Sequence, residues 1–83
     1  MSPEDIQSAV RSQPFEPFRM VLTDGTGYDV RHPDLVLLGR RSLVVGLNSD
    51  PGSTLYERTV KVDLLHISRL EPLETSTKPN GQS

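Results

Sequence analysis

Residues 18–30, with the sequence FRMVLTDGTGYDV, decide the fold. Apolar and polar residues alternate on both sides of a central Asp-Gly pair, which is typical of two strands joined by a tight turn. A two-residue loop would set Met20 opposite Asp29 and mix the apolar and polar faces. A three-residue loop ending at Gly25 sets Met20 opposite Tyr28, and the faces then agree. We therefore predict an antiparallel hairpin with Gly25 in the left-handed position of a bulged turn.

The remaining apolar residues fall into short runs separated by turn signals. Ser2 followed by Pro3 predicts a helix start, and Pro14 predicts its end. No helix lies between successive strands, so the sheet is predicted to be antiparallel. The second strand is expected to continue to His32, where Pro33 interrupts the chain. An apolar run follows the interruption at residues 35–38, and further strands are expected at residues 43–47, 55–62 and 67–73, with one helical turn at residues 63–66 that Asp63 caps.

These elements predict a mainly β fold. A short N-terminal α-helix is followed by a five-stranded antiparallel small barrel, since closure removes exposed strand edges. Residues 1–73 form the single domain, and residues 74–83, which contain no apolar side chain, are expected to be a disordered tail. The order of elements resembles the SH3-like and Sm-like small barrels, in which a helical turn also precedes the last strand. No position here matches an Sm nucleotide-binding motif, so that resemblance assigns no functional residue.

Two strings carry a second resemblance. Residues 13–34, QPFEPFRMVLTDGTGYDVRHPD, and residues 62–73, VDLLHISRLEPL, are similar to a group of short bacterial proteins that has no assigned activity. This resemblance supports the domain boundaries and implies no chemistry.

The composition excludes several classes of protein. The 83 residues include no cysteine and 2 histidines, so neither a disulfide framework nor a thiolate zinc site is expected. There are 9 Lys and Arg against 11 Asp and Glu, and this net charge of -2 argues against a general nucleic-acid binder. No apolar run could span a bilayer, and the first residues lack the pattern of a secretory signal. We expect a cytoplasmic protein with no cofactor, metal, membrane partner or small-molecule substrate.

Residues 35–38 and 43–47 are apolar on both faces, which predicts cover on both sides. One face is expected to belong to the core. On the other face we predict an interface with a second copy or another protein. The predicted interface residues are Val36, Leu38, Val44 and Gly46. The alternative is that Val36, Leu38 and Val44 are merely tolerated surface residues, or that Phe15 and the N-terminal helix cover them.

Arginines supply a second candidate site. Arg40 and Arg41 are adjacent at a predicted turn, and with Arg31 they are candidates to bind an anion or nucleic acid. The alternative is a solvated turn that keeps an apolar hairpin soluble. By strand alternation, Arg31 points away from Tyr28 and His32, so these three are not expected to form one patch.

The sequence holds no paired nucleophile and base and no phosphate-binding glycine loop, so we expect no catalytic residues and no enzyme activity. The favoured function is a non-enzymatic protein-interaction or self-association module. The alternative is an Sm-like or SH3-like nucleic-acid-binding protein that uses the arginine patch.

Overall fold

The predicted hairpin is present, in the predicted register. The computed structural model describes residues 1–73, and in it strand β1 (Phe18–Leu22) pairs antiparallel with β2 (Gly27–Val30), with Met20 opposite Tyr28. Gly25 has a φ of +91°, and its N–H donates to the carbonyl oxygen at the end of β1 at 2.9 Å. The glycine therefore occupies the left-handed position, as predicted.

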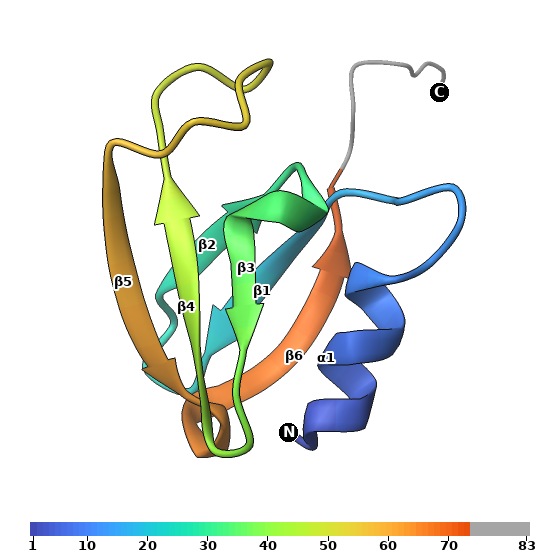
Figure 1. The fold of residues 1–83 in the computed structure, drawn as a ribbon. Coiled ribbons are helices and arrows are strands. Elements are labelled where there is room, and N and C mark those ends of the chain that lie inside the picture. Colours follow the sequence, from blue (N-terminus) through green and yellow to red (C-terminus); the bar gives the residue numbers. More distant parts are fainter. Residues whose placement is uncertain (74–83) are drawn as a thin grey trace, which may run out of the picture.

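Within residues 1–73, six strands form two three-stranded sheets (Figure 1). In the first sheet, β1 lies between β2 and the last strand, β6 (Ile67–Pro72). In the second, β4 (Ser42–Leu47) lies between β3 (Val36–Leu38) and β5 (Arg58–Asp63). Every strand pair is antiparallel, as the absence of crossover helices predicted.

The mainly β class with a short N-terminal helix is confirmed, but the prediction of five strands in a closed barrel is wrong. The structure has six strands and no closed barrel among the described residues. The cause lies between β2 and β3, where Pro33 begins a 3-10 turn, η1 (Pro33–Leu35). Pro33 has no N–H to donate, and the turn breaks the ladder, so β2 pairs only with β1. The strands on either side of this turn, β2 and β3, therefore belong to different sheets.

Helix α1 (Pro3–Val10) begins where the sequence predicted. The Ser2 side-chain oxygen accepts a hydrogen bond from the Asp5 backbone N–H at 3.3 Å. Ile6 is 0% exposed, and the helix packs against β3 and lies beside β6 (Figure 1). A helix this short depends on such packing for its stability. The predicted disordered tail at residues 74–83 lies outside the described residues.

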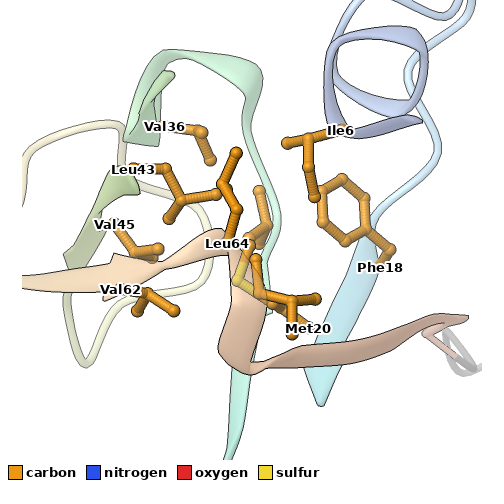
Figure 2. Close-up of a cluster of buried hydrophobic side chains, with 10 residues drawn as sticks. Ile6, Phe18, Met20, Val36, Leu43, Val45, Val62 and Leu64 are labelled. Carbon is orange, nitrogen blue, oxygen red and sulfur yellow. The ribbon is translucent and has the colours of Figure 1, made fainter. Parts of the chain in front are cut away.

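One apolar core joins both sheets and the helix (Figure 2). Each buried aliphatic side chain contributes about 1.5–3 kcal/mol relative to an exposed one. The 3-10 turn η2 (Leu64–His66) closes one end, and the Asp63 carboxylate caps it by accepting from the Leu65 N–H at 3.0 Å, as predicted. The largest fully buried side chains are Ile6, Met20, Val30, Leu43 and Val45.

No helix among residues 1–73 has the length and apolar character that crossing a bilayer requires.

Candidate functional site

The sheet formed by β3, β4 and β5 has an apolar outer face. Val36 pairs with Val45, and both side chains lie in the core. The next pair, Leu37 with Val44, therefore points the other way, because side chains alternate along a strand. Leu37 is 71% exposed and Val44 is half-buried. The sequence predicted that both faces of this segment are covered, and within the described residues Leu37 has little cover.

The four predicted interface residues are divided between the core and this outer face. Val36 is 8% exposed and belongs to the core. Leu38 is half-buried, packs against the core, and lines a shallow hollow beside α1. Gly46 is buried, and Val44 is the one of the four that presents a partly exposed side chain on the outer face.

Tyr56 extends the outer face beyond the predicted residues. A Cβ built on Gly46 would lie 2.9 Å from the Tyr56 Cβ and 3.1 Å from the Leu35 Cδ2. Only glycine at this position lets Tyr56 lie against β4, where its side chain is still 63% exposed. The backbone just before Tyr56 is held by a hydrogen bond, in which Asn48 Nδ2 donates to the Leu55 carbonyl oxygen at 2.7 Å. We call Leu37, Val44 and Tyr56 the apolar outer face.

Sequence reasoning missed Leu37 and Tyr56. An unbroken apolar run does not show which residues point inward, and the register between β3 and β4 settles it. Tyr56 was expected within a strand at residues 55–62, but β5 begins at Arg58, so strand alternation does not give the direction of Tyr56.

The three candidate arginines do not form one patch. Arg31 follows β2, whereas Arg40 and Arg41 occupy the turn after β3, so they lie at opposite ends of that strand (Figure 1). Arg40 and Arg41 are both exposed. The Arg41 carbonyl oxygen accepts from the Leu64 N–H at 2.9 Å, which ties this turn to η2.

Arg31 instead lines a groove of about 490 Å³ between the outer face of the first sheet and the loop after β4. Arg19 Nε donates to Asp29 Oδ1 at 2.7 Å, and Arg31 Nη2 lies 3.3 Å from Asp29 Oδ2. Across the floor, Arg69 Nε lies 2.6 Å from Glu71 Oε2. The groove therefore contains three guanidinium groups and two carboxylates. The hairpin register already placed Arg19 opposite Asp29, whereas Arg69 and Glu71 reach the groove through the distant pairing of β1 with β6.

Hydrogen bonds shift the pKa of two groups near this groove. The hydrogen bond to Asp29, helped by the charge of that carboxylate, raises the pKa of Arg19 above its usual value. Asp24, in the hairpin turn, accepts from the Thr26 N–H at 2.9 Å, and this bond lowers the pKa of the Asp24 carboxyl group. Arg19 therefore carries its full positive charge at every physiological pH.

Tyr28, Arg31 and His32 all line the groove, but Tyr28 pairs with Met20 on the inner side of the sheet, whereas Arg31 bonds Asp29 on the outer side. Strand alternation holds only while the strand continues, and β2 ends at Val30. His32 then turns toward the loop after β4, where its Nε2 lies 3.1 Å from the Pro51 carbonyl oxygen.

Among residues 1–73, no cluster of three or more histidine, aspartate or glutamate side chains is placed to hold a metal ion. No family model, curated protein or solved structure matches the chain.

Proposed function

We propose that this chain is a non-enzymatic, cytoplasmic interaction module that self-associates through its apolar outer face. The observation that carries the proposal is the exposure of Leu37 beside Val44, with Tyr56 exposed on the same side of the sheet. Adjacent exposed apolar side chains on a small domain mark interaction sites more often than isolated ones do. Aromatic residues such as tyrosine are also enriched at the centres of interfaces.

The charges beside this face favour a second copy of the chain as the partner. Lys61 pairs with Val44 and Asp63 pairs with Ser42, so β5 carries both signs of charge along the outer face. In a two-fold dimer the same face of both copies meets, so one residue contacts a different residue of the second copy and the reverse contact also forms. A face that carries both signs of charge can therefore place positive groups against negative groups of the second copy. A partner surface with a single sign of charge would attract only one of Lys61 and Asp63 and would repel the other.

The experiment is size-exclusion chromatography with light scattering over a range of protein concentrations. The average mass should rise with concentration toward that of a dimer. Leu37→Gln should raise the dissociation constant about tenfold or more, as expected for a residue at the centre of an interface. Val44→Asp should abolish association, because it buries an unpaired charge.

Leu65→Gln is the matched control. Leu65 is 81% exposed but lies on η2, away from the apolar outer face, so its replacement should leave the mass profile unchanged. A wild-type protein that is monomeric at every concentration would contradict the proposal, as would equal effects of Leu37→Gln and Leu65→Gln.

Nucleic-acid binding is the second proposal. It is supported by the two adjacent exposed arginines, Arg40 and Arg41, and by the likeness of the η2 turn before β6 to Sm-like and SH3-like architecture. Titration with single-stranded RNA at low salt should then give binding that weakens with added salt. Arg40→Ala with Arg41→Ala should reduce both the affinity and its salt dependence. Binding that is weakened neither by added salt nor by this double substitution would reject the alternative.

A further inference from the structure

Strand β2 leaves one of its edges unpaired. Within residues 1–73, it lies at the margin of the first sheet and pairs only with β1. An unpaired edge presents a row of backbone N–H and C=O groups that can pair with another extended chain. Tyr28 and Asp29 of β2 line the groove, as does Arg31 just after it, and no second strand of residues 1–73 pairs with β2 at this edge.

The hairpin register shows which backbone groups face the groove. The Leu22 N–H donates to the Thr26 carbonyl oxygen at 2.7 Å, so these two residues form a hydrogen-bonded pair. Hydrogen-bonded pairs recur every second residue in an antiparallel ladder, which directs the backbone groups of Tyr28 and Val30 toward β1. The backbone groups of Gly27 and Asp29 therefore point to the free edge, and Arg31 follows directly after the strand.

Charge at this edge favours an acidic group on the incoming chain. Arg19 and Arg31 share the single carboxylate of Asp29, which leaves one positive charge unbalanced. Arg31 donates to Asp29 Oδ2 through Nη2 at 3.3 Å, and a guanidinium carries five N–H donors in all. Arg31 is half-exposed, so its remaining donors can reach a second carboxylate.

One wall of the groove is apolar. Leu35 is buried, and Tyr28 and Leu47 are half-buried beside the core, and all three line the groove. Side chains of an added strand would alternate between this wall and the charged outer face. The groove is therefore suited to a segment in which every second residue is apolar.

We propose that β2 accepts an extended segment of a partner protein as an additional antiparallel strand. The segment places an acidic residue opposite Arg31, an uncharged residue opposite Asp29, and apolar residues between them that face the wall of the groove. Main-chain hydrogen bonds to Gly27 and Asp29 provide affinity, and the side chains provide specificity. This surface is distinct from the apolar outer face, so it does not depend on self-association.

The test is an NMR titration of the full chain, observed at its backbone amides. Two peptides with blocked termini, EVTVT and KVTVT, are added in separate experiments. EVTVT should shift the amides of Gly27, Asp29 and Arg31, and KVTVT should bind about tenfold more weakly or not at all. Arg31→Gln should weaken EVTVT binding by a similar factor. Arg58→Gln, which removes an exposed arginine outside the groove, should not.

Methylated peptides test the strand pairing itself. In antiparallel pairing, the glutamate and threonine nitrogens of EVTVT face β2, whereas the valine nitrogens face away. N-methylation of the glutamate and threonine residues should abolish binding, and N-methylation of the valines should leave it unchanged. Equal binding of the two methylated peptides, or of EVTVT and KVTVT, would overturn the proposal. A short single-stranded RNA that displaces EVTVT and binds more tightly would overturn it in favour of nucleic acid.

Discussion

A single backbone angle at Gly25 sets how β1 and β2 pair. The three-residue loop brings the chain back in a register that puts Met20 beside Tyr28 on the inner side and Arg19 beside Asp29 on the outer side. Residue-scale features of this kind could be predicted from the sequence, because the Asp-Gly pair and the alternating pattern lie within a few residues of each other. The sharing of Asp29 by Arg31 could not, since Arg31 lies beyond the end of the strand.

Gly25→Ala should destabilise the protein by about 1–2 kcal/mol, because a φ of +91° is strained for any residue with a Cβ. Gly52→Ala is the matched control, since a Cβ there would make only an ordinary contact of 3.5 Å with Asp50 Oδ1. Urea denaturation of both variants measures the difference. Equal stabilities of the two variants would contradict the assignment of the turn.

Asp24 should make stability depend on acid pH. Its folded pKa lies below the ordinary aspartate value of about 3.9, so its contribution is present above that pH and is lost as the pH falls through the folded pKa. The stability advantage of the wild type over Asp24→Ala should therefore be constant near neutral pH and should shrink below about pH 4. Thermal unfolding across this range measures it, and an advantage that does not change with pH would argue against the turn hydrogen bond.

At the scale of elements, α1 and β3 show where sequence patterns are informative and where they are not. The helix start was predictable because Ser2 and Pro3 act locally. The faces of β3 were not, since every residue in the run is apolar and only its pairing with β4 directs Val36 inward and Leu37 outward. The interface residues predicted from that run consequently include some that belong to the core.

Ile6 should be the residue through which α1 stabilises the domain. It is fully buried against the core, so Ile6→Val should cost about 0.5–1.5 kcal/mol and Ile6→Ala about 2–5 kcal/mol. Gln7→Ala, on the exposed side of the same helix, should change stability by less than about 0.5 kcal/mol. Chemical denaturation gives these values, and an Ile6→Ala variant as stable as Gln7→Ala would show that the helix is not docked.

At the scale of the whole molecule, two sheets share one core without closing into a barrel. The number and direction of strand pairs follow from local turns, whereas closure depends on whether strand edges distant in sequence meet. Pro33 and η1 prevent that continuity between β2 and β3, and the sequence showed the proline without showing its consequence for closure. The groove exists because the edge of β2 is left unpaired there.

The two sheets should unfold together, because each contributes fully buried side chains to the same cluster. Amides in the central strands β1 and β4 should exchange with solvent deuterium with the same free energy of opening. Native-state hydrogen exchange in low denaturant measures this. Two distinct opening energies, one for each sheet, would show that the core is divided.

The position of β1 also bears on the order of events during synthesis. Its first partner, β2, leaves the ribosome soon after it, but its second partner, β6, is the last strand of the described chain. A nascent chain can form the β1–β2 hairpin and the whole second sheet while Ile67 and the rest of β6 are still in the exit tunnel. Throughout that interval, one side of β1 and the inner faces of both sheets lack their final cover. The growing polypeptide is therefore most exposed to chaperones and to misassembly just before its last strand is released.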